Sequence, residues 1–402
     1  MRIKPSSATF TLLLGLLAAV PSFGLDMSLP ALAATGADLD ASASDVGLTI
    51  SAFMLSLAAA PLVYGPASDY LGRKPVVIFG CALFVVASIG CAVAQSLSAL
   101  LTWRLVQGAG AAGTTITLAI IRDLFDAQAA RAKTSYVIIA INTVPMVAPT
   151  AGAALLTLGG WRLIYTALLV VGLIVLLAVS LGFRESARID PAGRLTPSVI
   201  ARNYFRVLTH RICLGYILVN ASAFAAIFAY ASGSSLFFIN VVGLRPDVYG
   251  LIFGASAAAV MGGAFLDGRL LARGISPFYP LMIGLALLAV CAIGLLAMTL
   301  AGWMPLPLVI SLMIAAAFAF GLVTPNAMNG AMQPLPQIAG AAGAAAGSIQ
   351  ILAGAVSSGV VAICFDGHSA LSMTAVMASC SILALACYLL IARPAERVAL
   401  SP

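Results

Sequence analysis

The 402-residue sequence is 62% hydrophobic and only 8% charged, against roughly 25% charged residues in an average soluble domain. A water-soluble chain of this length needs far more polar surface to cover its core, so the composition excludes an ordinary soluble protein. The net charge of +7 does not predict nucleic-acid binding, because the basic residues stand in short clusters between apolar runs, a pattern typical of membrane topology.

Apolar stretches of about 20 residues predict an all-α membrane protein with twelve transmembrane helices. Their approximate ranges are 8–34, 45–67, 75–95, 97–121, 133–157, 162–183, 211–236, 248–271, 277–300, 305–329, 340–364 and 369–391. The first stretch follows Arg2 and Lys4, as the apolar part of a signal peptide would. It is long enough to span a bilayer, so we expect it to be retained.

The basic residues predict the orientation of these spans. With a cytoplasmic N-terminus, the outward loops contain only Arg162 and Arg245, and Arg104 lies inside a span. All other Lys and Arg residues then fall on the cytoplasmic side, as the positive-inside rule requires. We therefore expect a multi-pass protein of the bacterial inner membrane with both termini in the cytoplasm.

A long hydrophilic segment separates six spans from six. The predicted domains are an N-terminal six-helix bundle (1–183), a cytoplasmic linker (184–210) and a C-terminal six-helix bundle (211–402). The spacing of Gly65 and Asp69 after span two returns as Gly263 and Asp267 near the end of span eight. Two pseudo-symmetric bundles predict a central binding site that is reached by rocking one half against the other.

Three sequence motifs occur in order in the first half. Between spans two and three, Gly65-x-x-x-Asp69-x-x-Gly72-Arg73-Lys74 forms a short basic loop in which Gly72 permits a sharp turn. Span four contains residues 104–110 (RLVQGAG), and span five contains residues 145–152 (PMVAPTAG).

These motifs resemble the loop 2–3, R-x-x-Q-G-x-G and antiporter signatures of the major facilitator superfamily. The resemblance implies that the loop residues latch the two halves on the cytoplasmic side. It also implies that Pro145, Pro149 and Gly152 belong to the antiporter motif of exporters. Ala148 stands where the general motif has a glycine.

Residues 25–32 (LDMSLPAL) are similar to the D-M-Y-L-P-A pattern of the Bcr/CflA drug-resistance transporters, with Ser28 in place of the usual tyrosine. Residues 325–327, residues 339–344 and Gln350 resemble the C-terminal half of that family. The resemblance covers essentially the whole chain and implies proton-driven export of compounds such as bicyclomycin or phenicol antibiotics. We expect no cofactor beyond the proton gradient, no bound metal, a monomeric chain, and small molecules, protons and lipid as partners.

Asp26 and Arg104 are the two charged residues inside the apolar spans. At 1.5 Å per residue they lie about 13 Å and about 10 Å from the outer edge, and charged side chains at such depth are typically functional. Burial disfavours the ionised carboxylate, whereas a nearby guanidinium favours it. Asp26 is therefore predicted to bind and release the coupled proton, with Arg104 as its partner. The alternative is a static ion pair that joins two helices.

Other polar and aromatic side chains within the spans are candidates for the substrate cavity. They are Asn142, Asn220, Phe224, Phe228, Tyr230, Asn326 and Gln350. Hydrogen bonds between helices or simple packing account for these residues equally well.

Two other functions remain open. The same fold supports proton-coupled transport of a metabolite, whether export or uptake by symport. A membrane enzyme is the alternative from another class, but His210 and His368 are far apart and no catalytic motif is present. The seven cysteines show no C-x-x-C spacing.

Overall fold

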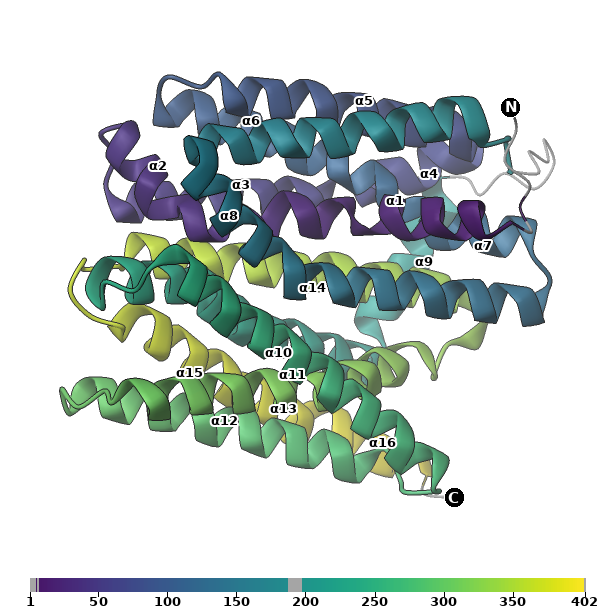
Figure 1. Cartoon of the computed structure of the whole chain (residues 1–402). Helices are drawn as coiled ribbons and strands as arrows, with labels where there is room; N and C mark the ends of the chain where they lie inside the picture. The colour runs from purple at the N-terminus through teal and green to yellow at the C-terminus, as the bar shows by residue number, and fades with distance from the viewer. Residues whose placement is uncertain (1–4, 6, 187–196, 401–402) are drawn as a thin grey trace. The chain divides into compact units, whose positions relative to one another are not determined.

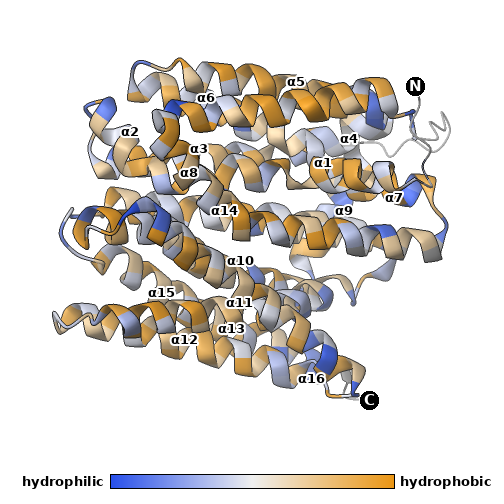
Figure 2. Cartoon of the chain, in the orientation of Figure 1, coloured by the Kyte–Doolittle hydropathy of each residue, from blue (hydrophilic) through white to orange (hydrophobic). Residues whose placement is uncertain are grey.

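The computed structural model describes residues 5, 7–186 and 197–400. All regular structure in these ranges is helical (Figure 1). Hydrophobic residues run along the helices, and hydrophilic residues gather at helix ends and connections (Figure 2). Helices are expected because peptide groups in hydrocarbon must be paired within the segment that crosses it.

The helices up to residue 182 follow one another with short connections. They are α1 (Ala8–Asp26), the 3₁₀ helix η1 (Leu29–Ala31), α2 (Leu32–Asp38), α3 (Ala43–Ala59), α4 (Pro61–Leu71), α5 (Arg73–Ala92), α6 (Leu97–Ala112), the 3₁₀ helix η2 (Gly113–Ile116), α7 (Thr117–Leu124) and α8 (Ala127–Gly182).

The helices from residue 197 onward complete the chain. They are α9 (Pro197–Thr209), α10 (Arg211–Ser235), the π-helix η3 (Leu236–Val241), α11 (Pro246–Ala272), α12 (Phe278–Leu300), α13 (Leu306–Met332), the 3₁₀ helix η4 (Pro336–Ile338), α14 (Ala339–Ile363), α15 (Leu371–Cys387), the π-helix η5 (Tyr388–Ala392) and α16 (Arg393–Leu400).

Within the described ranges, ten helical stretches are long and apolar enough to cross a membrane. The one in α8 contains two crossings, because the backbone leaves helical geometry at Gly159 and Gly160. Both ends of α8 accordingly meet the start of α1: the Phe10 ring lies 6.2 Å from that of Phe183, and the Lys133 ammonium donates to the Thr11 hydroxyl. The continuous segment α6–η2–α7 supplies a further crossing, which confirms the predicted twelve.

The chain divides into two compact units. Unit 1 comprises Met1–Arg194 with Leu244–Gly254, and unit 2 comprises Leu195–Gly243 with Ala255–Pro402. The predicted domain boundaries remain predictions, and residues 187–196 of the predicted linker lie outside the described residues. The described end of the linker forms α9, which packs on α14 and α10 with Val207 buried and Phe205 exposed.

Glycines bring the helices of unit 1 into direct backbone contact. A side-chain carbon added at Gly108 of α6 would lie 2.1 Å from the Phe53 carbonyl oxygen in α3. One added at Gly110 would lie 2.4 Å from the Phe84 backbone nitrogen in α5. The glycines of the R-x-x-Q-G-x-G motif therefore allow α6 to pack closely between α3 and α5.

Glycines play the same part in unit 2. A side-chain carbon at Gly263 of α11 would lie 2.1 Å from the Phe318 carbonyl oxygen in α13, and one at Gly321 of α13 would lie 2.1 Å from the Val260 carbonyl oxygen in α11. Small residues at such crossings are the usual basis of helix association in membranes.

We predict that Gly110→Ala destabilises the protein, because its methyl group meets backbone rather than a movable side chain. Overpacking of this kind costs about 1–3 kcal/mol, so the melting temperature of the detergent-purified protein should fall. Gly347→Ala in α14 is the matched control, since no described atom of its own unit lies within 4 Å of the added carbon. Equal melting temperatures for the two variants would contradict this packing.

Candidate functional site

The first crossing is interrupted directly after Asp26. Helix α1 ends there, and the chain turns into η1 and α2. Pro30 accounts for the interruption, because it has no N–H to donate to the Asp26 carbonyl four residues earlier. The Ser28 N–H bonds instead to the Leu25 oxygen at 3.4 Å, which leaves the Gly24 carbonyl available to another donor. The predicted span 8–34 did not include this break.

Arg104 of α6 supplies that donor. It is 0% exposed, and its Nη1 donates to the Gly24 carbonyl at 2.7 Å and to Gln107 Oε1 at 2.8 Å. Its Nε donates to the Thr49 carbonyl of α3 at 3.3 Å, and its Nη2 donates to the Ser28 hydroxyl at 3.4 Å. A buried cation is costly unless its donors are satisfied, and neutral oxygens from α1, α3 and α6 satisfy this one. Arg104 therefore joins three helices at the break.

Aromatic rings and a second amide extend this joint. The Arg104 Cζ atom lies 4.5 Å from the ring centroid of Phe53 and 5.8 Å from that of Tyr165, and ring faces attract cations. The Gln107 Nε2 group donates to the Ser88 hydroxyl of α5 at 2.9 Å. The arginine and glutamine of the R-x-x-Q motif thus belong to one connected network.

The antiporter-like motif of α8 also meets the break. A side-chain carbon at Gly152 would lie 2.1 Å from the Met27 carbonyl oxygen, so only glycine permits this approach. Pro145 and Pro149 lie inside α8, where each removes one helical N–H donor. Residues from all three family-like patterns in spans one, four and five are therefore brought together around residues 24–28.

Asp26 lies at this break but is not bound by Arg104. Its side chain is 6% exposed, and no ion pair or carboxylate hydrogen bond joins it to any other residue that the structure describes. The static ion pair with Arg104, considered as the alternative, is therefore wrong. Among the described residues, Asp26 is a buried acid without a cation, and Arg104, which binds residues 24 and 28 on either side of it, is a buried cation without an acid.

The loop between spans two and three folds as a helix end, a glycine turn and a helix start. Gly72 has φ 102°, a conformation that favours glycine. The Glu185 carboxylate accepts the backbone N–H groups of Arg73 and Lys74 at 2.8 and 3.1 Å. An acid at this position caps α5, because the first N–H groups of a helix have no helical partner. A side-chain carbon at Gly72 would lie 2.5 Å from that carboxylate.

The two basic side chains of the loop bind other helices of unit 1. Arg73 Nε donates to Asp123 Oδ2 of α7 at 2.9 Å, and its Nη1 donates to the Ser68 hydroxyl of α4 at 2.5 Å. Lys74 Nζ donates to the Ser180 carbonyl of α8 at 2.9 Å. Arg73 and Lys74 therefore connect the ends of four helices.

The remaining loop residues are less informative. The Gly65 carbonyl accepts the Ser68 hydroxyl at 2.8 Å, and the side chain of Asp69 lies outside the described residues. Sequence analysis did not single out Glu185. The usable signal was an acid directly after the sixth span, at the same predicted side of the membrane as the basic loop.

The predicted cavity residues of unit 2 form separate pairs. Asn220 Nδ2 donates to Gln350 Oε1 at 2.9 Å, which joins α10 to α14. Asn326 Nδ2 donates to Asp267 Oδ1 at 2.6 Å, which joins α13 to α11. The side chain of Asn142, the predicted cavity residue of unit 1, lies outside the described residues.

The predicted aromatic residues also find partners. The rings of Phe224 and Phe228 stack with centroids 4.3 Å apart, and Phe320 of α13 lies 6.0 Å from Phe224. The Tyr230 and Ser256 hydroxyls are hydrogen-bonded at 2.7 Å. Phe320 was not singled out from the sequence, since an aromatic residue in an apolar span carries no signal of its own.

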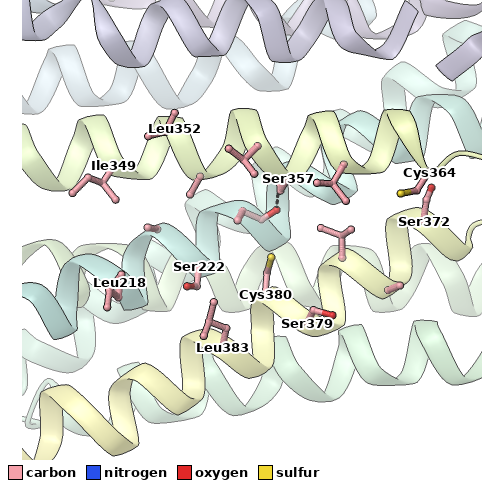
Figure 3. Close-up of a pocket in the computed structure, with 17 residues that line it drawn as sticks. Leu218, Ser222, Ile349, Leu352, Ser357, Cys364, Ser372, Ser379, Cys380 and Leu383 are labelled. Atoms are coloured by element: carbon pink, nitrogen blue, oxygen red, sulfur yellow. Dashed lines mark hydrogen bonds between the residues drawn. The ribbon is translucent and has the colours of Figure 1, made fainter. Parts of the chain in front are cut away.

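An apolar groove of about 760 Å³ lies between α10, α14 and α15 (Figure 3). Leu218, Ile349, Leu352 and Leu383 contribute to its wall, and Ser357 on the wall donates to the Ala225 carbonyl at 2.8 Å. None of the predicted cavity residues lines this groove, so the two are different places on unit 2. The described residues contain no group of three His, Cys, Asp or Glu side chains that could hold a metal ion.

Comparison with known families decides the class of the protein. The family described as Major Facilitator Superfamily matches residues 14–361. The chain belongs to this superfamily. The resemblance stated from the motifs is thereby confirmed, and the superfamily consists of transporters.

The relatives of this superfamily member include two whose names agree with the subfamily resemblance. The bicyclomycin resistance protein homolog of Haemophilus influenzae is 27% identical over 96% of this chain and 97% of its own length. Multidrug resistance protein D of Escherichia coli is 29% identical over 89% of each chain. The uncharacterized MFS-type transporter YdgK of Bacillus subtilis is 31% identical over 91% of this chain and 90% of its own length.

Solved structures of transporters share the fold. A bacterial homolog of the human lysosomal transporter Spinster, inward-facing and unoccupied, matches with a TM-score of 0.78 and 18% identity over 99% of each chain. A D-xylose-proton symporter matches with a TM-score of 0.74 and 16% identity, over 95% of this chain and 98% of its own. The predicted two-bundle major facilitator fold is confirmed.

We predict that Arg104→Lys strongly destabilises unit 1, although it keeps the positive charge. A single ammonium cannot replace the planar guanidinium that reaches Gly24, Thr49 and Gln107 together. Breaking a buried charged network costs about 3–5 kcal/mol, which should appear as a lower melting temperature. Arg122→Lys, at an exposed position of α7, should leave the melting temperature unchanged. An unchanged melting temperature for Arg104→Lys would refute the role of Arg104 in joining α1, α3 and α6.

A second prediction concerns the helix cap at Glu185. Glu185→Ala removes the acceptor of two N–H groups, so the backbone amides at the start of α5 should exchange with deuterium faster. Losing a helix cap costs about 0.5–2 kcal/mol, which corresponds to an increase of several-fold. Arg184→Ala, at the exposed neighbouring position, should leave the exchange of that peptide as it was. Equal exchange in both variants would show that Glu185 is not the cap.

Proposed function

We propose that this transporter exports small-molecule drugs or related metabolites in exchange for protons. Its relatives named for bicyclomycin and multidrug resistance support drugs as cargo. The antiporter-like motif of span five supports export. The cargo in this proposal is of the bicyclomycin or phenicol type.

The buried carboxyl group of Asp26, which has no ion pair or hydrogen bond with the described residues, carries the proposal. An ionised carboxylate without a cation is strongly disfavoured in a medium of low dielectric constant, so the side chain is stable there when protonated. Opening the site to water on one side would allow ionisation and release of the proton. Cargo and proton would then bind alternately, either at one place or through opposite conformations.

The break in α1 supports such a switch. Because α1 ends at Asp26, peptide groups near this residue are hydrogen-bonded to other helices and not within α1. Small movements of the backbone at Asp26 therefore do not require a helical turn to unfold. Arg104 donates to the Gly24 carbonyl on one side of the acid, and Gly152 allows the close approach of the Met27 carbonyl on the other side. In the proposal, Arg104 acts on Asp26 by holding this backbone rather than through a direct ion pair.

The proton gradient drives the cycle. A charge that crosses the membrane gains about 2.3 kcal/mol per 100 mV. Gly65, Asp69, Gly72, Arg73 and Lys74 act in the proposal as a conformational latch on the cytoplasmic side. The protein works as a monomer in the bacterial inner membrane, with both termini in the cytoplasm and without a cofactor.

The proposed substrate residues complete the proposal. They are Asn142, Asn220, Phe224, Phe228, Tyr230, Asn326 and Gln350. The alternative is a proton-coupled metabolite transporter of the same fold, working by export or uptake. The direction of counterflow in inverted vesicles distinguishes uptake from export, and a drug-susceptibility profile in a pump-deleted host distinguishes drugs from metabolites.

We predict that Asp26→Asn abolishes pH-gradient-driven transport but retains exchange of labelled for unlabelled cargo. The amide cannot carry the proton, whereas cargo movement without a gradient does not need it. The measurement uses proteoliposomes and a drug identified by the susceptibility profile. Asp40→Asn is the matched control, because Asp40 is exposed and its φ of 49° suits asparagine. Undiminished gradient-driven transport in Asp26→Asn would disprove the proposed coupling.

A further inference from the structure

Two helices of unit 2 present matched faces to each other. On α10, Asn220, Phe224 and Phe228 follow at intervals of four residues and therefore share one face. On α13, Phe320, Thr324 and Met328 do the same. The faces meet at both ends of this stretch, because Phe224 lies 6.0 Å from Phe320 and Asn220 Nδ2 lies 3.5 Å from the Met328 sulfur.

Two polar atoms on these faces have no hydrogen-bond partner among the described residues. They are Asn220 Oδ1 and Thr324 Oγ1, both buried from solvent, and Asn220 as a whole is 0% exposed. Leaving such an atom unsatisfied is costly, and buried polar groups in proteins are almost always paired with protein, water or ligand. The Asn220 oxygen can only accept a hydrogen bond, so its missing partner is a donor.

The Gln350 amide determines which other hydrogen-bonding groups lie beside Asn220. Asn220 and Gln350 already share one hydrogen bond, which leaves one amide oxygen and one amide NH₂ group for other partners. Exchanging the oxygen and nitrogen positions of both amides, which look alike in a structure, leaves the same complement. The Thr324 hydroxyl adds a donor. None of these side chains ionises, so the set suits a neutral ligand.

We propose that Asn220, Thr324 and Gln350 form a subsite for the secondary amide or lactam of a neutral ligand, whose aromatic or apolar part packs on the Phe224–Phe228–Phe320 cluster. The ligand N–H donates to Asn220 Oδ1, and its carbonyl accepts from the Thr324 hydroxyl or the Gln350 amide. This subsite gives the cargo of the proposed function a chemical class, and it rests on that function. The apolar groove between α10, α14 and α15 lacks this combination.

The test uses a ligand pair that differs only in the donor. Cyclo(L-Phe-L-Pro) is neutral and has one lactam N–H and one aromatic ring, and its N-methyl derivative lacks that donor. A ring is chosen because it keeps the amide geometry constant when the nitrogen is methylated. Binding is measured by titration calorimetry on the purified full-length protein in lipid nanodiscs.

We expect the unmethylated lactam to bind the wild-type protein about tenfold more tightly, the usual effect of satisfying a buried polar atom. Asn220→Leu should remove this preference, while binding of the N-methyl derivative persists. Thr324→Val is nearly isosteric and should weaken the binding of both ligands by the same factor, since both keep the carbonyl. Unchanged binding of both ligands to Thr324→Val would contradict the subsite even if Asn220→Leu does not fold. Asn329→Leu, at an exposed position of α13, should preserve it.

Equal binding of both ligands to the wild-type protein, or binding of neither, overturns the subsite, as does a preference that survives in Asn220→Leu. Proteoliposomes separate this result from the proposed function. If a pH gradient drives both ligands equally, the subsite is refuted and proton-coupled export stands. If binding discriminates between the ligands but no gradient drives either, the subsite is supported and proton-coupled export fails.

Discussion

In a chain that crosses hydrocarbon, every peptide group and every charge must find its partner within the protein. Arg104 shows how unit 1 meets this constraint. Pro30 forces α1 to end early, the Gly24 carbonyl loses its helical donor, and the guanidinium supplies a new one. The same group also binds Thr49 in α3 and Gln107 in α6. The break in α1 is therefore stabilised by a residue from span four, and the geometry around Asp26 depends on that contact.

Much of this arrangement followed from the sequence, because membrane segments have few ways to satisfy their backbone. The length of the apolar stretches predicted twelve crossings, and the motifs predicted the superfamily. Asp26 and Arg104 were singled out as candidates because charges are rare within spans. Gly152 was singled out through its motif, but the sequence did not show why a glycine is needed there. The structure supplies the reason, because an added side-chain carbon would lie 2.1 Å from the Met27 carbonyl oxygen.

Other features had no signal in a single sequence. The absence of an Asp26–Arg104 ion pair depends on which atoms the guanidinium reaches, and span positions give depth but not direction. Asn220 and Gln350 are 130 residues apart, so their pairing needs the packing of α10 on α14. Thr324 and Phe320 are ordinary residues in an apolar helix. Only the three-dimensional arrangement shows that the Thr324 hydroxyl has no hydrogen-bond partner among the described residues and that Phe320 belongs to an aromatic cluster.

The way in which Arg104 is satisfied has a consequence for how unit 1 responds to acidity. Carbonyl and hydroxyl dipoles do not change their protonation over the range in which bacteria live, and neither does a guanidinium. The joint between α1, α3 and α6 therefore keeps its strength whether or not the neighbouring carboxyl group carries a proton. At the break in α1, a network of groups that keep their protonation state thus lies beside one carboxyl group, so that in the proposed function a change in proton occupancy at Asp26 leaves the hydrogen bonds of Arg104 in place.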